Sequence, residues 1–448
     1  MNQSARKLAI EILLSVLKKQ AYSNIELDQA IKHHALKPQD RHLLTNIVYG
    51  VLQQKYLLDF QLAPFIKKPQ KMDDWVQILL ETAVYQMKYL TRIPIRAVIY
   101  ESVQIAKRRG HQGVAKLVNA ILRNVQRQGW RDLADIQDQW ARLSIEYSIP
   151  VSLIHQLNQD LGSEKTVQIL TSINTVPKIS LRVNEVVISR KELQEALLDV
   201  DIHTTESVIS PQGLITTTGV SELTQTELFK TGAFTFQDES AQLVVPALQV
   251  QPGDQVLDAC AAPGGKTMQI AANLSASAGG QVTALDLYEH KVKLIQQNVQ
   301  RMHLNSVVKT RLLDATTADT KFLEETFDRI LVDAPCSGIG LLRRKPEIRY
   351  RKELTDFVNL KKVQLQILNS VAKTLKRGGT MVYSTCTIIK QENEMVVENF
   401  LKHHSDFELT KTYSTVALKS KSNEKSLHIY PDDYHSDGFF IATLKRKS

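Results

Sequence analysis

The chain has 448 residues, of which 43% are apolar and 23% are charged. This length favours two or three domains, and the composition excludes a disordered or fibrous protein. No apolar run approaches the roughly 18 residues that a membrane span requires. The N-terminal apolar patch is interrupted by Glu11, as in an amphipathic helix rather than a signal peptide. We therefore expect a cytoplasmic protein without membrane segments.

The charged residues and the cysteines limit the partners further. The net charge of +9 indicates a polyanionic partner, with nucleic acid as one candidate. The three cysteines, Cys260, Cys336 and Cys386, are too few for a disulfide framework and fit a reducing compartment. They form no Cys-x-x-Cys pair and no Cys/His cluster, so no metal is expected. All three follow predicted strands in the C-terminal half of the chain.

The N-terminal part has the periodicity of helices. One apolar stripe follows the i, i+3, i+4, i+7, i+8 spacing of a helix face: Ala9, Ile12, Leu13, Val16 and Leu17. Further helices are expected over residues 74–90, 96–108 and 113–128. We predict an all-helical domain over residues 1–140.

The middle of the chain mixes both periodicities. Residues 179–186 are typical of a strand, residues 191–200 of a helix, and the stretches 214–223 and 234–240 of short strands. We predict a small α+β domain over residues 141–235.

From residue 236 onward, predicted strands alternate with predicted helices, which indicates a parallel sheet. The strands are expected over residues 255–259, 281–286, 307–314, 327–335 and 380–386. A helix over about 355–376 is expected to turn at Gly378 and Gly379 into the last of these strands. We predict a Rossmann-like α/β domain over residues 236–448, so that the whole chain is a multidomain protein.

The segment LDACAAPGGKT (257–267) follows the first of these strands. It matches a phosphate-binding loop at Gly265, Lys266 and Thr267, but Cys260 stands where that loop has its first glycine. The apolar run that ends at Asp333 could supply the second half of such a site. A nucleotide hydrolase is therefore one alternative.

Four strands of this domain end in an acid: Asp258, Asp286, Asp314 and Asp333. A row of carboxylates would repel a triphosphate but suits a ligand with ribose hydroxyls, an adenine amine and a positive centre, as in S-adenosylmethionine. Asp286 is placed for the ribose hydroxyls and Asp314 for the adenine amine. The other interpretation is that such acids cap the helices that follow them.

Two cysteines follow strands at the same edge of the expected sheet, in DAPCSG (333–338) and STCT (384–387). A lone cysteine is usually a small buried apolar residue, but Cys336 and Cys386 have turn-forming or polar neighbours. A methyl donor beside a thiol indicates methylation at carbon 5 of a pyrimidine. Addition of a thiolate to carbon 6 activates that carbon, and the base must leave its stack to be reached.

A basic segment, LLRRKPEIRYRK (341–352), comes directly after Cys336. We expect it to contact the phosphate backbone of a nucleic acid, although a charge run is commonly a solvated face. Its candidate RNA-binding residues are Arg343, Arg344, Lys345, Arg349 and Arg351.

Several motifs resemble those of the RNA 5-methylcytosine methyltransferases. They are QDESAQL (237–243), LDACAAPGGKT, LVDAPCSG, YSTCT followed by Glu392-Asn393-Glu394, and DGFF (437–440). The stretches 40–52, 89–108 and 116–123 resemble the helical RNA-binding domain of the antitermination factor NusB. The combination is similar to bacterial enzymes of this family that act on small-subunit (16S) ribosomal RNA. It implies S-adenosylmethionine as cofactor.

The resemblance also implies roles for single residues. The methionine end of the cofactor would be surrounded by the loop Cys260, Ala261, Ala262, Pro263, Gly264, Gly265 and Lys266. Asp286 and Asp314 would bind ribose and adenine. Asp333 would lie between cofactor and target cytosine, with Lys266 beside it. Cys386 would be the nucleophile, and Cys336 would assist product release.

This chain departs from the family pattern at Thr387, Glu347 and Tyr350, which affects the expected RNA contacts rather than the chemistry. Three alternatives stay open besides methylation of 16S RNA: methylation of tRNA or another RNA, nucleotide hydrolysis, and a non-catalytic RNA-binding assembly factor. The chain is expected to act as a monomer.

Overall fold

The structure is a computed structural model that describes residues 4–419 and 425–448. Its chain forms two compact units. One consists of Met1–Asn174 together with Arg344–Glu353, and the other of Thr175–Arg343 together with Leu354–Ser448. Within the described ranges, no helix has the length and apolar character needed to cross a membrane.

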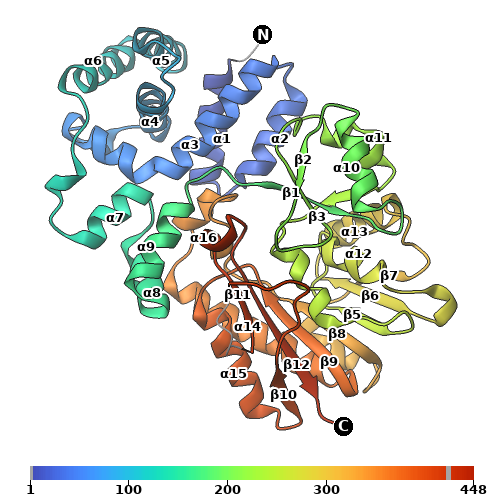
Figure 1. Cartoon of the computed structure of the whole chain (residues 1–448). Coiled ribbons are helices and arrows are strands. Elements are labelled where there is room, and N and C mark those ends of the chain that lie inside the picture. The colour runs from blue at the N-terminus through green and yellow to red at the C-terminus, as the bar shows by residue number, and fades with distance from the viewer. Residues whose placement is uncertain (1–3, 420–424) are drawn as a thin grey trace. The chain divides into compact units, whose positions relative to one another are not determined.

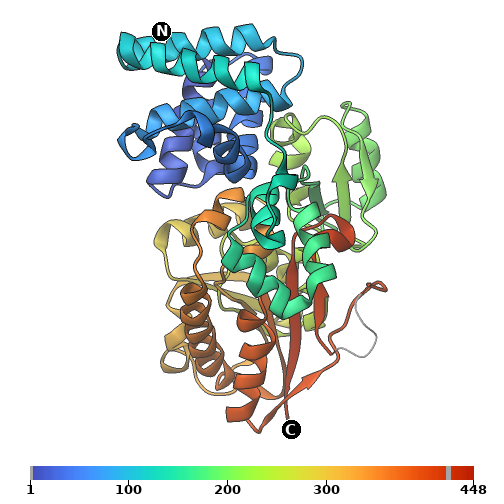
Figure 2. The same cartoon turned by 90° about the vertical axis from the view of Figure 1, so that its left-hand side faces the viewer.

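The first unit is helical, as expected. Its helices are α1 (Ala5–Lys18), α2 (Ser23–His33), α3 (Pro38–Leu62), α4 (Asp74–Tyr89), α5 (Ile95–Arg109), α6 (Gln112–Gln128), α7 (Gln139–Tyr147), α8 (Val151–Leu161) and α9 (Ser163–Ser172). The α1 helix begins where the Ser4 side chain accepts a hydrogen bond from the Lys7 amide. The apolar faces of α1 and α3–α6 form one core around Leu13, Val51 and Val84. Figure 2 shows α5 and α6, in cyan, running beside each other.

This unit extends beyond the boundary expected at residue 140. Helix α7 packs on α3, and the Ser148 hydroxyl after it accepts a hydrogen bond of 3.1 Å from the Tyr56 amide in α3. The compact helical unit therefore ends at Asn174. The amphipathic pattern of α7–α9 indicates helices but not the surface on which they pack.

The basic segment Arg344–Glu353 is built into the helical unit. Glu347 accepts hydrogen bonds from the Ser23 amide (3.0 Å) and hydroxyl (2.9 Å). The Arg349 side chain is fully buried and donates to the Tyr147 carbonyl (2.9 Å) and to Oδ1 of Asn174 (3.0 Å). This corrects the expectation that Arg349 contacts RNA, because its guanidinium is enclosed by protein acceptors.

The second unit begins with a small α+β domain, as expected. Its elements are β1 (Ile179–Val183), α10 (Arg190–Leu198), β2 (Thr204–Glu206), β3 (Gly213–Thr216), α11 (Glu227–Lys230) and β4 (Phe234–Phe236). The strands form an antiparallel sheet in the order β2-β3-β1-β4, with Leu181, Leu193 and Phe234 in its core. The expected strand over 214–223 is shorter, since β3 ends at Thr216.

A large mixed sheet forms the rest of this unit. Its elements are β5 (Gln255–Asp258), α12 (Gly265–Ala271), β6 (Gln281–Asp286), α13 (Glu289–Arg301), β7 (Val308–Leu312), β8 (Phe327–Asp333), α14 (Leu354–Ala372), β9 (Leu375–Thr385), α15 (Glu394–His403), β10 (Phe407–Thr410), β11 (Leu427–Ile429), α16 (Pro431–Tyr434) and β12 (Phe439–Arg446). The order is β10-β12-β9-β8-β5-β6-β7, with β11 paired to β12. Strands β5–β9 are parallel and β10–β12 antiparallel to their neighbours.

Helices cover both faces of this sheet, which confirms the Rossmann-like architecture. Successive residues of a strand point to opposite faces: Val256 joins the core formed with α12 and α13, whereas Leu257 joins the core formed with α14 and α15. Figure 1 shows α14 and α15, in orange, packed beside each other on one face. The near-continuous apolar strands follow from this double coverage.

The glycine pair expected to start strand β9 lies inside it. β9 begins at Leu375, and its pairing with β8 shifts register between Phe327↔Leu375 and Arg329↔Thr380. Gly378 adopts a φ of +75° within this irregular stretch. A bulge of this kind inserts extra residues into a strand without ending it, so the turn expected from the glycine pair is a bulge.

The role of Arg349 can be tested by replacing it with methionine. Arg349→Met leaves buried acceptors without donors, so we expect the free energy of unfolding to fall by about 3 kcal/mol. The measurement is thermal and urea unfolding of the full chain. Arg108→Met, at an exposed position of α5, is the control and should change little. Unchanged stability with weakened RNA binding would instead return Arg349 to the RNA interface.

Candidate active site

The candidate site lies at the topological switch point of the large sheet, next to β5. β6 and β7 continue from one side of β5, while β8 and β9 lie on its other side. Ligands of open α/β sheets bind at this point, outside the carboxyl ends of the strands. A pocket of about 130 Å³ is present there, lined by Phe236, Gln237, Asp258, Cys260, Ala261, Ala262, Pro263, Gly265, Lys266 and Asp333.

The loop between β5 and α12 is a tight turn. The Ala261 amide donates to the Leu285 carbonyl on β6 (2.8 Å), and the Gly264 amide donates back to the Ala261 carbonyl (2.7 Å). Gly264 has a φ of +101° with Ile295 packed 3.4 Å from where a Cβ would stand, so a side chain is disfavoured there. The turn brings Lys266, in the first turn of α12, to the end of the neighbouring strand β8.

Lys266 and Asp333 form an ion pair at the wall of the pocket. The Lys266 ammonium lies 2.7 Å from Oδ2 of Asp333, and the Ser384 hydroxyl donates to Oδ1 at 2.8 Å. The ammonium also lies 5.0 Å from the ring centre of Phe439. Both oxygens of Asp333 are thus engaged, and the carboxylate has a defined orientation.

Asp258, at the end of β5, is fully buried beneath the loop. Its Oδ2 accepts a hydrogen bond of 2.6 Å from the Thr267 hydroxyl. Burial raises the pKa of Asp258 to about 7, although the bond from Thr267 acts in the opposite direction. The arrangement assigns Asp258 to the support of α12.

The two cysteines at the sheet edge face each other. The Sγ atoms of Cys336 and Cys386 are 3.2 Å apart, and both residues are partly exposed. The hydrogen bond with Cys386, together with burial, raises the pKa of Cys336 well above its usual range. Either sulfur can be the hydrogen-bond donor in this contact. Burial also raises the pKa of Cys260, which makes it an unreactive thiol.

Two glycines allow the backbone around the thiols to pack closely. The Gly340 amide donates to the Cys386 carbonyl (3.0 Å), and the Gly438 amide donates to the Gly340 carbonyl (2.9 Å). A Cβ on Gly438 would stand 2.6 Å from the Ile388 side chain and 2.9 Å from the Cα of Gly340. This contact gives a physical reason for the glycine in the DGFF motif.

Asp286 and Asp314 do not line this pocket. Asp286 accepts a hydrogen bond from the Tyr288 amide (3.1 Å) and lies 3.9 Å from the Lys291 ammonium. Asp314 is exposed and caps a short helical turn by accepting from the Thr316 amide (2.9 Å). The capping alternative thus applies to Asp314, and the ribose and adenine contacts of both acids stay predictions.

Other basic residues of the segment 341–352 also have protein partners. Arg343 is buried and donates to the carbonyls of Ser436 (3.0 Å) and Pro431 (2.8 Å), which corrects the expectation that it contacts RNA. Arg351 donates to backbone carbonyls of the helical unit, and Lys345 lies 5.6 Å from the ring centre of Tyr22. Arg344, Lys345 and Arg351 are half-buried, and their phosphate contacts stay predictions.

A supporting residue that the sequence pattern did not reveal is Arg182 on β1. Its buried guanidinium donates to the side chain of Gln237 and to the Gly265 carbonyl (2.5 Å). Burial without an acidic partner lowers the pKa of Arg182 to about 9. An arginine between the apolar residues Leu181 and Val183 of this strand is the signal that could have identified it. Its partner Gln237 belongs to the motif QDESAQL, to which the sequence alone assigned no function.

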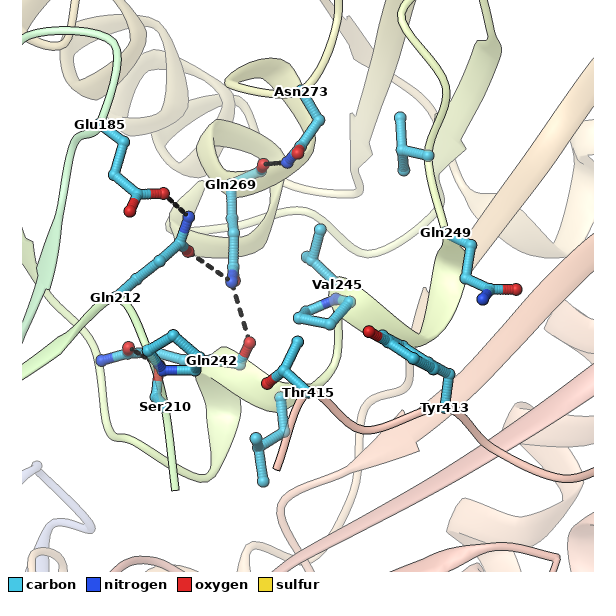
Figure 3. Close-up of a pocket in the computed structure, with 14 residues that line it drawn as sticks. Glu185, Ser210, Gln212, Gln242, Val245, Gln249, Gln269, Asn273, Tyr413 and Thr415 are labelled. Carbon is cyan, nitrogen blue, oxygen red and sulfur yellow. Dashed lines mark hydrogen bonds between the residues drawn. The ribbon is translucent and has the colours of Figure 1, made fainter. Parts of the chain in front are cut away.

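A second pocket, of about 420 Å³, adjoins this support (Figure 3). Gln269 on α12 donates to the Gln242 carbonyl (2.9 Å) and to the Gln212 side chain (3.3 Å), and Asn273 donates to the Gln269 carbonyl (2.8 Å). The bond between Gln269 and Gln212 joins α12 to the small α+β domain. The network therefore holds α12, the helix that follows the loop of the candidate site.

The sequence matches three family models along its length. Residues 245–445 match the family described as 16S rRNA methyltransferase RsmB/F, and residues 3–127 match the NusB family. Residues 149–221 match the ferredoxin-like domain of RsmF/B-like methyltransferases.

The chain is similar to curated proteins and solved structures over almost its whole length. It is 41% identical to the probable ribosomal RNA small subunit methyltransferase B of Bacillus subtilis, over 99% of each chain. It is 34% identical to the corresponding probable enzyme of Synechocystis, again over 99% of each. The solved structure of PH0851 has a TM-score of 0.84 and 26% identity, and covers 99% of this chain and 98% of its own.

The burial of Asp258 predicts a pH dependence of stability. Its folded-state pKa of about 7 lies above the ordinary 3.8, so the folded chain binds the extra proton between these values and loses stability as pH rises through them. Asp258→Asn removes this loss. We expect the variant to gain roughly 2–3 kcal/mol relative to the unsubstituted protein between pH 5 and pH 8. The measurement is urea unfolding of both proteins at pH 5 and pH 8. If their unfolding free energies differ by the same amount at both pH values, the raised pKa of Asp258 is contradicted.

Proposed function

The chain belongs to the ribosomal RNA small subunit methyltransferase B family, and from this premise we propose that it methylates carbon 5 of a cytosine in 16S ribosomal RNA through a cysteine adduct. The methyl donor would be S-adenosylmethionine. The observation that carries the proposal is the thiol pair Cys336 and Cys386, 3.2 Å apart, on the strand ends next to the Lys266–Asp333 ion pair.

The cofactor, when bound, supplies a methyl group on a positively charged sulfur. The pocket fits such a group, because its wall combines the turn from Cys260 to Pro263 with the carboxylate of Asp333. The loop from Cys260 to Lys266 would surround the methionine end. Asp286 and Asp314, at the ends of the next strands, would bind the ribose and the adenine amine.

The carbon-5 position of cytosine needs activation before it can accept a methyl group. Cys386 as thiolate would add to carbon 6, which makes carbon 5 nucleophilic. Asp333 would hydrogen-bond the edge of the cytosine ring. Its orientation by Lys266 and Ser384 supports this role, since a carboxylate held at both oxygens keeps its position when the base arrives.

Release of the product requires the reverse of the addition. A base such as water takes the carbon-5 proton, the electrons of that bond form the carbon 5–carbon 6 double bond, and the electrons of the carbon–sulfur bond return to Cys386. Cys336 would donate its S–H to the departing sulfur. The raised pKa of Cys336, from its bond with Cys386 and from burial, supports this donor role.

The other enzymatic alternative fits the geometry less well. In a phosphate-binding loop the lysine would be free for the phosphates, whereas the Lys266 ammonium is paired with Asp333. A triphosphate in this pocket would also face the carboxylates of Asp258 and Asp333. Methylation of tRNA by the same chemistry remains an alternative at the level of the substrate.

The thiol roles predict which variant accumulates a protein–RNA adduct. With unmodified 16S RNA and S-adenosylmethionine, Cys336→Ala should form an adduct that survives a denaturing gel, because attack proceeds and release is slowed. Cys386→Ala should form none. An adduct with Cys386→Ala alone would reverse the two roles. No adduct with either variant, and no methyl transfer by the unsubstituted protein, would reject the chemistry. Repeating the assay with tRNA separates the two substrates.

The cofactor site predicts a loss of affinity at the end of β6. Asp286→Ala should weaken binding of S-adenosylmethionine by roughly 10- to 100-fold, the effect of losing hydrogen bonds to a charged acceptor. Cys386→Ala should bind the cofactor normally, because its thiol serves the RNA. Isothermal titration calorimetry measures the dissociation constant of each variant. An Asp286→Ala affinity equal to that of the unsubstituted protein would exclude Asp286 from the cofactor site.

A further inference from the structure

A buried carboxylate lies behind the two thiols. Glu392 is fully buried in the turn between β9 and α15. Its carboxylate accepts hydrogen bonds from the amide of Ser337 (2.8 Å), from the Ser337 hydroxyl, and from Nε2 of Gln364 (3.2 Å). None of these hydrogen bonds involves a sulfur atom, and Glu392 is not among the residues that line the pocket at Asp333.

The bonds of Glu392 reach both cysteine loops. Ser337 follows Cys336 directly, and its hydroxyl lies 2.9 Å from Oγ1 of Thr387, which follows Cys386. The carboxylate, the Ser337 hydroxyl and the Thr387 hydroxyl thus form a continuous chain between the two loops. This chain runs parallel to the contact between the sulfur atoms.

The backbone around Glu392 is held equally firmly. The Tyr383 hydroxyl on β9 donates to the Glu392 carbonyl (2.6 Å), and the side chain of the next residue, Asn393, donates to the Thr387 carbonyl (3.0 Å). The carboxylate is therefore placed by β9, the strand that ends at the Cys386 loop. From this position it holds the loop that follows β8.

All printed partners of the Glu392 carboxylate are donors. An ionised carboxylate is an acceptor only, so the bonds match the ionised form. Burial raises the pKa of Glu392, whereas the bonds from Ser337 and Gln364 lower it. The Ser337 hydroxyl donates to the carboxylate and also shares a hydrogen bond with the Thr387 hydroxyl, so these groups connect the two cysteine loops.

We propose that Glu392 is a positioning residue that holds the Cys336 loop against the Cys386 loop, so that the S–H of Cys336 meets the sulfur that leaves the methylated cytosine. This inference rests on the proposed function. It assigns Glu392 to the release step and not to attack, because Cys386 keeps its place at the end of β9 without the carboxylate.

The test separates the first turnover from later ones. Glu392→Ala frees the Cys336 loop, so methyl transfer in a single turnover should stay within about threefold of normal while the steady-state rate falls by about tenfold or more. The protein–RNA adduct should accumulate, as expected for Cys336→Ala. Glu392→Gln should restore most of the steady-state rate, because its amide oxygen can accept from the two N–H groups and its NH₂ can donate to Ser337.

A matched control removes a different buried carboxylate of the same unit. Glu239 is also fully buried and binds Lys178 (2.8 Å) and the Ser207 hydroxyl (2.6 Å). Glu239→Ala should lower thermal stability without accumulating adduct. If Glu392→Ala does not yield folded protein, Ser337→Ala breaks the same chain and should give the same accumulation.

Three results would overturn the inference in distinguishable ways. A proportional loss of single-turnover and steady-state rates in Glu392→Ala would show only a structural role. An adduct in Cys336→Ala but not in Glu392→Ala or Ser337→Ala would reject the inference and leave the proposed function intact. Absence of methyl transfer by the unsubstituted protein would reject the proposed function itself.

Discussion

The parallel pairing of β8 and β9 is the constraint on which the site depends. It sets Asp333 opposite Ser384, so the loops that leave these two strands emerge side by side at the same edge of the sheet. Cys336 and Cys386, three and two residues further along, therefore meet although 50 residues separate them. A shift of this pairing by one residue would turn the side chains of β9 to the opposite faces and separate the two thiols.

The charged groups around this edge are stabilised in different ways, and the differences correspond to different roles. Asp333 has an ion pair and remains partly exposed, where a substrate can reach it. Asp258 and Glu392 are buried, one under the loop between β5 and α12 and one behind the thiols, and each is held by hydroxyl or amide donors. Arg182 is buried among neutral acceptors. Burial of a charge is costly unless hydrogen bonds compensate it, so the hydrogen bonds of these buried groups hold the surrounding elements in place.

The basic segment after Cys336 has a structural consequence of its own. Arg344–Glu353 packs with the helices of the first unit, while Arg343 is anchored to Pro431 and Ser436 in the second. The chain thus passes from the second unit to the first between the adjacent residues Arg343 and Arg344. The Cys336 loop is continuous in sequence with this segment, which belongs to the unit that matches the NusB family.

The fold class and the meeting of Cys336 with Cys386 at one edge of the sheet could be predicted from the sequence, because they depend on local periodicity and on short motifs at strand ends. The sequence also placed Lys266 and Asp333 in one site, since parallel strands end at one edge. Only the tertiary structure decided that Arg343 and Arg349 are buried, that Asp314 caps a turn, and that Glu392 bridges the cysteine loops. A run of charges has the same appearance whether it faces solvent or protein. Its environment is set by partners such as Ser23 and Asn174, which lie 324 and 175 residues away in sequence and meet it only when the chain has folded.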